Sequence, residues 1–260
     1  MDATTVGYLL EESAQLISDI GGYDPVTEAE DLLVKSDTPN IFDEYLEQII
    51  NHHIPVAYIT KHAKFMGLDL FIDERVLIPR KETEPLVEIA IQELGNEASV
   101  VDVGTGSGAV ALAVKNARPD LKVTGVDISK DALDVAAINS GALGLDVNWK
   151  DADLLEGVRG EFDCVLANLP YLPTTKKDSY APEMTEHEPQ VALWGGADGF
   201  DLTRRLLAQV ASRRMVKLLA LELGIGQEQA VTDLIRAAGF PVVFCTTDAK
   251  GEIRAAIGKR

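Results

Sequence analysis

The sequence has few cysteines and no long apolar run. Its two cysteines, Cys164 and Cys245, form neither a CxxC pair nor a disulfide framework, which is typical of proteins in a reducing compartment. No apolar stretch approaches the roughly 18 residues of a membrane-spanning helix, and the acidic N-terminus lacks the basic start of a signal peptide. We therefore expect a cytoplasmic protein that does not interact with a membrane.

Basic residues are also scarce relative to acidic ones. Lys and Arg together number 24 and Asp and Glu 42, which gives a net charge of −18. A chain this acidic repels a phosphate backbone, so the charge argues against direct nucleic-acid binding. The histidines show no metal-ligand spacing and have no cysteine partner, so we expect no metal site. They are His52, His53, His62 and His187.

The first 62 residues carry apolar side chains at helical spacing and show no strand pattern. The helical stripes comprise Leu9, Leu10, Ala14, Leu16 and Ile17, then Leu32, Leu33 and Val34, then Phe42, Tyr45, Leu46, Ile49 and Ile50. From Ala63 the pattern alternates, which predicts a β-hairpin in which Phe65–Ile72 pairs with Val76–Ile78. We expect an N-terminal helical domain at residues 1–62 and a β-hairpin linker at residues 63–80.

Residues 81–260 alternate between short apolar strands and helices. The expected strands are Ser99–Val103, Leu121–Val126, Asp146–Trp149, Phe162–Ala167, Val216–Leu221, Phe240–Phe244 and Ile253–Ile257. The expected helices are one that begins near Pro85 and those at Ala109–Asn116, Lys130–Asn139, Leu202–Ala211 and Gln227–Ala238. This alternation predicts a doubly wound, Rossmann-like α/β domain.

A glycine-rich loop follows the first of these strands. Gly104, Gly106 and Gly108 let the chain turn tightly and let a ligand approach the backbone, and the helix N-terminus that follows offers free N–H groups. Asp127 ends the second strand, where a carboxylate can accept both hydroxyls of a ribose. Ser129 is the better N-cap for the next helix, so Asp127 is free for a ligand. Together these features indicate a nucleoside cofactor, either NAD or S-adenosylmethionine.

A polar tetrad follows the strand at Phe162–Ala167. Ligands bind at the carboxyl ends of parallel strands, so Asn168 should lie beside the cofactor. Its side-chain oxygen and the main-chain carbonyl of Leu169 are two acceptors that can orient a planar –NH₂ group for methylation. Pro170 stiffens the turn, and the ring of Tyr171 can cover the planar group.

The tetrad Asn168-Leu169-Pro170-Tyr171 resembles the [N/D]-P-P-[Y/F] signature of methyltransferases that act on planar amino nitrogens. The chain as a whole is similar to the HemK-type family, the protein-(glutamine N5) methyltransferases that modify peptide chain release factors. Leu169 and Lys81 replace prolines that the family usually carries. The resemblance rests further on Pro55–Ile59, Phe65–Leu68, Leu77–Glu84, Asp102–Gly108, Glu188-Pro189 with Ala192-Leu193, Gly195–Gly199, Leu221–Gly224, and Asp248, Gly251 and Arg254.

The resemblance implies S-adenosylmethionine as cofactor and a release factor as partner, with methyl transfer to the glutamine of its Gly-Gly-Gln loop. It places the cofactor's methionine part on Gly104, Thr105, Gly106, Ser107 and Gly108, its ribose on Asp127 and its adenine on Asp153 and Leu154, with Asn168 beside it. It places the glutamine on Asn168, Leu169, Pro170 and Tyr171, with Arg80 and Glu82 at the border of the site. The helical domain would bind the protein substrate.

Several alternatives stay open. The target could be a glutamine of a ribosomal protein, or the protein could bind its ligand without turnover. An N-L-P-Y tetrad also resembles ribosomal-RNA adenine dimethyltransferases, which act on nucleic acid, although the segment Leu77–Glu84 and the negative charge argue against this function. The glycine loop alone would also suit an NAD-dependent oxidoreductase.

Overall fold

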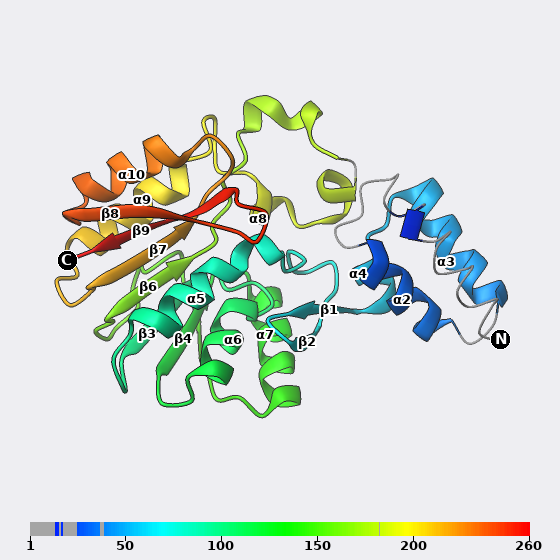
Figure 1. Ribbon diagram of the computed structural model, residues 1–260, viewed down its shortest axis with the longest axis horizontal. Coiled ribbons are helices and arrows are strands. Elements are labelled where there is room, and N and C mark those ends of the chain that lie inside the picture. The colour runs from blue at the N-terminus through cyan, green and yellow to red at the C-terminus, as the bar shows by residue number, and fades with distance from the viewer. Residues whose placement is uncertain (1–13, 16, 18–24, 37–38, 182) are drawn as a thin grey trace.

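The computed structural model describes residues 14–15, 17, 25–36, 39–181 and 183–260. Figure 1 shows helices at one end, a two-stranded hairpin and a larger α/β body. The helices are α2 (Pro25–Lys35), α3 (Pro39–His52), α4 (Val56–Thr60), α5 (Glu84–Glu93), α6 (Ala109–Ala117), α7 (Lys130–Leu143), α8 (Gln190–Leu193), α9 (Asp201–Ala211) and α10 (Glu228–Ala237), with short helical turns η1 (Lys81–Thr83), η2 (Thr174–Ser179) and η3 (Glu183–His187). The strands are β1 (His62–Phe65), β2 (Leu68–Phe71), β3 (Ser99–Val103), β4 (Lys122–Asp127), β5 (Asn148–Asp151), β6 (Cys164–Ala167), β7 (Leu218–Glu222), β8 (Val242–Thr247) and β9 (Ile253–Lys259).

The N-terminal helices have a hydrophobic core of their own. The expected second and third helical segments are present as α2 and α3, which contribute apolar side chains to one shared core. The expected first segment lies mostly outside the described residues. The buried apolar residues of this unit are Ile17, Ala29, Leu32, Phe42, Ile49 and Val56.

The hairpin differs from its predicted pairing. We expected Phe65–Ile72 to pair with Val76–Ile78, but β1 pairs with β2 in antiparallel register, with Phe65 opposite Leu68. The connection is the two-residue turn Met66-Gly67, and both residues have positive φ angles, of 48° and 77°. Turns of this kind match the twist of two paired strands. The prediction was wrong because it placed the turn at the acidic pair Asp73-Glu74 rather than at the glycine.

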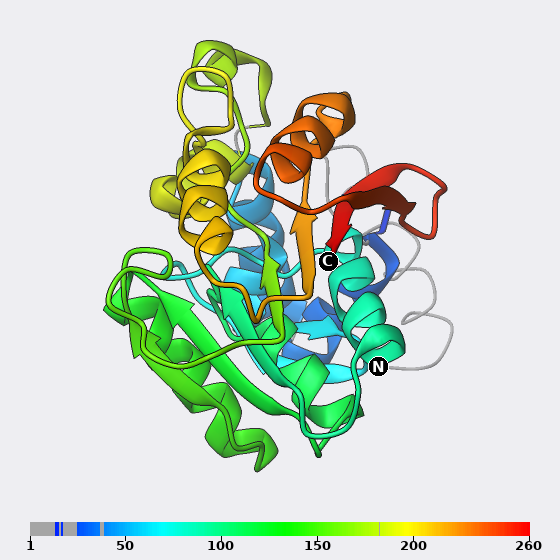
Figure 2. The same ribbon diagram turned by 90° about the vertical axis from the view of Figure 1, so that its left-hand side faces the viewer.

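The large body is built on a seven-stranded sheet in the order β5-β4-β3-β6-β7-β9-β8. The first five of these strands are parallel, and β9 runs antiparallel between β7 and β8. Along β6, Cys164 and Leu166 pack with α5, α6 and α7, whereas Val165 and Ala167 pack with α9 and α10. Figure 2 shows the two helical layers on opposite sides of the sheet. The predicted Rossmann-like fold is therefore confirmed, although β5 begins at Asn148 rather than at Asp146.

Among the residues that the structure describes, no helix is both long and apolar enough to cross a membrane.

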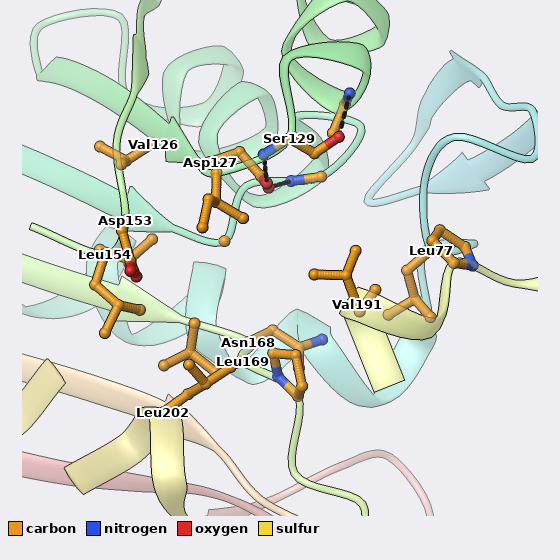
Figure 3. Close-up of a pocket in the computed structure, with 18 of the residues that line it drawn as sticks. Leu77, Val126, Asp127, Ser129, Asp153, Leu154, Asn168, Leu169, Val191 and Leu202 are labelled. Atoms are coloured by element: carbon orange, nitrogen blue, oxygen red, sulfur yellow. Dashed lines mark hydrogen bonds between the residues drawn. The ribbon is translucent and has the colours of Figure 1, made fainter. Parts of the chain in front are cut away.

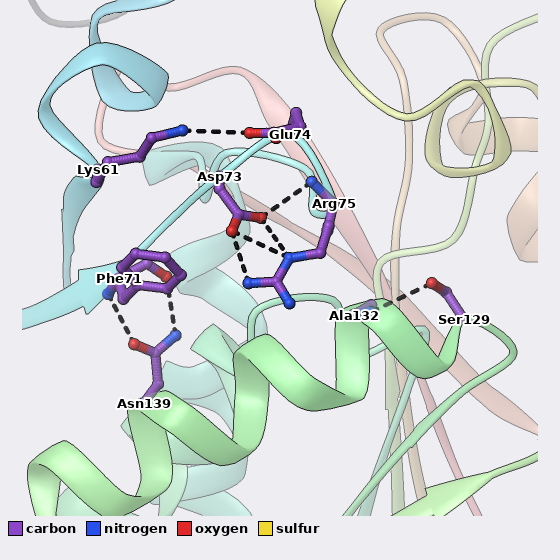
Figure 4. A network of polar contacts seen from close by, with 8 residues as sticks. All are labelled: Lys61, Phe71, Asp73, Glu74, Arg75, Ser129, Ala132 and Asn139. Atoms are coloured by element: carbon purple, nitrogen blue, oxygen red, sulfur yellow. Dashed lines mark hydrogen bonds and ion pairs between the residues drawn. The ribbon is translucent and has the colours of Figure 1, made fainter.

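One buried amide fastens the hairpin to the α/β body. Asn139 on α7 is 1% exposed. Its Oδ1 accepts a hydrogen bond from the Phe71 amide at 2.7 Å, and its Nδ2 donates to the Phe71 carbonyl at 3.1 Å (Figure 4). The same Nδ2 donates to the Ser107 carbonyl of the glycine loop at 3.0 Å. The hairpin and the glycine loop are thus held by one side chain.

We expect Asn139→Ala to lower the free energy of unfolding by about 2–4 kcal/mol, because the part-buried backbone groups of Phe71 and the buried carbonyl of Ser107 lose their partner. Urea denaturation measures the change. The matched control is Asn116→Ala, an exposed asparagine on α6, which should stay within about 0.5 kcal/mol of wild type. A loss for Asn139→Ala no larger than that of the control would contradict the fastening role.

Candidate functional site

The register of three parallel strands brings the expected site residues together. Val103 at the end of β3 is paired with Val126 of β4 and with Ala167 of β6. The next residues along the three strands are Gly104, Asp127 and Asn168, so they meet at the carboxyl edge of the sheet. A Cβ on Gly104 would lie 3.1 Å from the Leu169 Cδ2 atom, so this position has little room for a side chain. Chain order reverses between β3 and β6, where ligands bind in open α/β sheets.

A cleft enclosing about 850 Å³ of open space lies at this edge. Figure 3 shows Asp127 and Ser129 along one side, Asp153 and Leu154 at one end, and Asn168 and Leu169 facing Asp127. Val191 and Leu77 close the other end. The expected site residues that line the cleft are Gly104, Gly106, Asp127, Asp153, Leu154, Asn168, Leu169 and Pro170.

A second, smaller cavity shares part of this wall. The expected site residues that line it are Arg80, Gly104, Thr105, Gly106, Ser107 and Asn168. Gly104, Gly106 and Asn168 line both cavities, as does Leu77. Asn168 therefore stands where the two cavities adjoin, in reach of a ligand in either one.

Asp127 is hydrogen-bonded to the backbone of the glycine loop and to the backbone just before α7. Its Oδ2 accepts from the Gly106 amide and its Oδ1 from the Ser129 amide, each at 2.9 Å. Burial raises the pKa of Asp127, and hydrogen bonds from Ser129, Gly106 and Ile128 act in the opposite direction. Each carboxylate oxygen can accept more than one hydrogen bond. Ser129 caps α7, as predicted, through its hydroxyl and the Ala132 amide.

A second acid lies beneath the glycine loop. Asp102 is buried, and its Oδ2 accepts from the Thr105 hydroxyl at 2.6 Å. Burial raises the pKa of Asp102 to about 7, and the charge of Asp127 acts in the same direction. The glycine loop is thus held through Thr105 by a buried carboxyl group whose charged form is disfavoured by burial.

Asp153 and Leu154 lie at the end of the cleft formed by the segment after β5. The Asp153 carboxylate accepts from the Arg205 guanidinium of α9 at 2.7 Å. Arg205 also lines the cleft and was not among the predicted site residues. Its only signal in the sequence was a basic side chain within the helix expected at Leu202–Ala211.

Asn168 is held by a partner from the segment before α5. Its Nδ2 donates to the Thr83 hydroxyl oxygen at 3.1 Å. Leu169, which stands where the family usually has proline, is buried and belongs to the core formed with α9 and α10. The Leu169 side chain thus contributes to this hydrophobic core.

The remaining expected site residues are placed around the two cavities. The Arg80 guanidinium pairs with the buried Glu188 carboxylate at 2.7 Å, whereas Glu82 pairs with Lys250 at 3.3 Å. Gly108 is the N-cap residue of α6 with a φ of 83°, and a Cβ there would lie 2.9 Å from the Trp149 ring. The Tyr171 hydroxyl donates to the Glu222 Oε1 atom at 3.2 Å. Neither cavity is lined by Glu82, Gly108 or Tyr171.

Thr83, Glu188 and Glu222 were not predicted as functional residues. Each lies within a segment that carried the family resemblance, and that was the only signal in the sequence. Their partners are far away along the chain: Thr83 contacts Asn168, and Glu188 contacts both Arg80 and the Ile78 amide.

The known proteins to which this chain is similar agree with this fold. Residues 81–196 match the family model described as methyltransferase small domain. The release factor glutamine methyltransferase of Deinococcus radiodurans is 38% identical over 190 residues, which are 72% of this chain and 68% of its own. That of Moorella thermoacetica is 43% identical over 191 residues, 71% of this chain and 67% of its own. The crystal structure of a methyltransferase from Pyrococcus furiosus matches 84% of this chain and 98% of its own, with a TM-score of 0.58 and 17% identity, which shows the shared fold.

The fold and the cleft at its switch point therefore define a Rossmann-like methyltransferase. The similarity to these two relatives extends over about two thirds or more of each chain and identifies the family within this class. The chain belongs to the family of release factor glutamine methyltransferases.

The raised pKa of Asp102 leads to a prediction about stability. A carboxyl group whose pKa is about 7 when folded and near 3.9 when unfolded favours folding at low pH, and this contribution is lost as pH rises through 7. We expect the titration of Asp102 to lower the unfolding free energy of the wild-type protein by about 2–3 kcal/mol between pH 5 and pH 8. Asp102→Asn should remove that part of the decline, as measured by urea denaturation at both pH values.

The control is Asp146→Asn, which changes an exposed acid outside both cavities. It should keep the wild-type difference between the two pH values. If Asp102→Asn also keeps that difference, the carboxyl group does not titrate in this range.

Proposed function

We propose that the protein transfers a methyl group from S-adenosylmethionine to the side-chain amide nitrogen of a glutamine in the Gly-Gly-Gln loop of a peptide chain release factor. The position of Asn168 carries this proposal: it lines both adjoining cavities and its amide nitrogen is already held by Thr83. The names of the relatives support the choice of substrate. No described feature favours nucleic acid or NAD.

The residues of the larger cleft fit the proposed cofactor. Asp127 has acceptor capacity left for two ribose hydroxyls after its two backbone contacts. Leu154, Val126 and Leu202 supply an apolar wall for a planar base. Gly104 and Gly106 leave the backbone open to a close approach. When bound, the cofactor supplies an electrophilic methyl group on a sulfonium.

The chain's own residues act on the substrate amide. The nitrogen of an amide is a poor nucleophile because its lone pair is delocalised. The Asn168 Oδ1 atom and the Leu169 carbonyl would accept its two N–H groups and fix the direction of the lone pair. Holding the reacting atoms in line is the main source of rate acceleration in the proposed methyl transfer. The surplus proton leaves to solvent after the transfer, so no general base is required.

The assignment of Asp127 to the ribose is tested by Asp127→Ala. Hydrogen bonds to a charged group contribute about 1.5–3 kcal/mol, so we expect affinity for S-adenosylmethionine to fall by about 10- to 150-fold. Titration calorimetry measures it. The matched control is Asp131→Ala in the first turn of α7, which is exposed and lies outside the cleft. Unchanged affinity in Asp127→Ala would remove the ribose assignment.

The proposed activity itself is tested by mass spectrometry. A release factor is incubated with the protein and S-adenosylmethionine, and its peptides are searched for one added methyl group on the glutamine of the Gly-Gly-Gln loop. A release factor in which that glutamine is alanine, and the enzyme variant Asn168→Ala, serve as controls. A parallel reaction contains adenine-bearing RNA. Methylation of the RNA and not of the release factor would overturn the proposal.

We also propose that residues 1–62 form a substrate-recognition domain, residues 63–80 a linker and residues 81–260 the methyltransferase domain. The separate core of the N-terminal helices supports this division. Ala57 and Tyr58 pack instead with the large core, and the Tyr58 hydroxyl donates to the Val76 carbonyl at 2.7 Å. A truncation that leaves the large body intact should therefore begin at residue 56.

Deletion of residues 1–55 should change affinity for S-adenosylmethionine by less than about threefold, because the cleft is lined by residues 75–205. Methylation of intact release factor should fall by at least about a hundredfold, the equivalent of 2.7 kcal/mol of lost recognition. Calorimetry reports cofactor binding and shows that the truncated protein is folded, and kinetics report turnover. Retention of full turnover on intact release factor would contradict the proposed role.

A further inference from the structure

Three polar side chains from distant segments meet behind Asn168. Thr83 comes from η1, Tyr171 follows β6, and Glu222 ends β7. Thr83 and Glu222 are 4% and 7% exposed. The Tyr171 hydroxyl donates to the Glu222 Oε1 atom at 3.2 Å, and a hydrogen bond with the Thr83 side chain lowers the pKa of Glu222 against the larger effect of burial. Glu222 lines neither cavity, so it has no direct access to a ligand there.

The direction of these hydrogen bonds follows from counting protons. An ionised carboxylate only accepts, so Thr83 and Tyr171 must each donate to Glu222. The Thr83 hydroxyl has a single proton and can then only accept from Asn168. The amide nitrogen of Asn168 therefore faces Thr83, and its Oδ1 atom faces the opposite way.

This orientation matters for the proposed reaction. A substrate –NH₂ group needs acceptors, and an asparagine turned by half a rotation would present its own N–H groups instead. An unsupported side-chain amide has little preference between the two orientations, since oxygen and nitrogen are nearly the same size. We propose that Thr83 and Glu222 are positioning residues that hold Asn168 with its acceptor toward the substrate; the inference rests on the proposed amide methylation.

The charged side chains near Glu222 are paired with other residues, so the hydroxyl groups are left to orient Asn168. Arg80, Glu82 and Arg254 lie near the Glu222–Tyr171 pair. Each is engaged elsewhere: Arg80 with Glu188, Glu82 with Lys250, and Arg254 with Asp248. The Glu222 Oε2 atom is buried and has no hydrogen-bond partner among the described residues. Burial raises the pKa of Glu222 to about 7, so assays at pH 8 keep it largely ionised.

The first test compares two substitutions of Thr83. Thr83→Val keeps the shape and removes the hydroxyl, and we expect kcat on release factor to fall about tenfold, equivalent to about 1.4 kcal/mol. KM for S-adenosylmethionine should change by less than about twofold, because the hydroxyl acts on Asn168 and not on Asp127. Thr83→Ser restores the hydroxyl and should recover most of the loss. A wild-type kcat in Thr83→Val would overturn the proposal.

A double-mutant cycle separates positioning from a general structural role. If Thr83 acts through Asn168, Thr83→Val should cost less than about twofold further kcat in an Asn168→Ala background. Independent structural damage would multiply the two losses, and that result would overturn the proposal. Glu222→Gln belongs in the same series. The amide of the substituted side chain can donate a hydrogen bond to Thr83 as well as accept one, so the direction of that hydrogen bond is no longer fixed. We therefore expect Glu222→Gln to lower kcat as well, without changing KM for S-adenosylmethionine.

A second measurement needs no substrate, so it stays decisive if release factor is not methylated. The side-chain amide of Asn168 is observed by ¹⁵N–¹H NMR and assigned by its loss in Asn168→Ala. Because its N–H group is bonded to Thr83, it should exchange with solvent about tenfold faster in Thr83→Val than in wild type. Equal exchange rates would overturn the positioning role, whereas an inactive wild type with the expected exchange difference would overturn only the proposed function.

Discussion

The site depends on the register of β3 between β4 and β6. Because Val103 pairs with Val126 on one side and with Ala167 on the other, the next residues of the three strands lie side by side. A slip of one residue would exchange the two faces of a strand and bury the polar end in one of the hydrophobic layers. The alternation of Cys164 and Leu166 with Val165 and Ala167 between the two cores prevents that slip. Packing along the strands therefore sets the geometry at their ends.

Burial of acids near the cleft is the main electrostatic cost of this arrangement. Asp102, Asp127 and Glu222 all have raised pKa values because burial disfavours their charged forms. Each is held by hydroxyl or backbone donors rather than by a direct ion pair. Such donors favour the carboxylate without adding a further positive charge to a cleft that Arg75 and Arg205 already line, and a further cation there would repel the positively charged sulfonium of the proposed cofactor.

The features of the fold that depend on local sequence signals were predicted from the sequence. The strand at Ser99–Val103 and the cap at Ser129 match the structure because periodicity and capping are local signals. The hairpin failed because two turn signals competed, and Gly67, with its positive φ, formed the turn. Asp127 and Asn168 were found because both follow strands at one edge of the sheet. Thr83 and Glu222 were not, because contacts between η1, β6 and β7 depend on the three-dimensional arrangement and leave no period in the sequence.

The chain from the end of β2 at Phe71 to Thr83, just before α5, links the N-terminal unit to the site. Its backbone is bonded to Asn139 at Phe71, to the Tyr58 hydroxyl at Val76 and to the Glu188 carboxylate at Ile78. Further along, Thr83 holds Asn168. Leu77 lines both cavities within the same segment. Hydrogen bonds thus fix this part of the chain at four points, Phe71, Val76, Ile78 and Thr83, between the N-terminal helices and the cavities. A rigid wall of this kind favours positioning of the substrate over a large closing motion, in agreement with a reaction whose main demand is alignment.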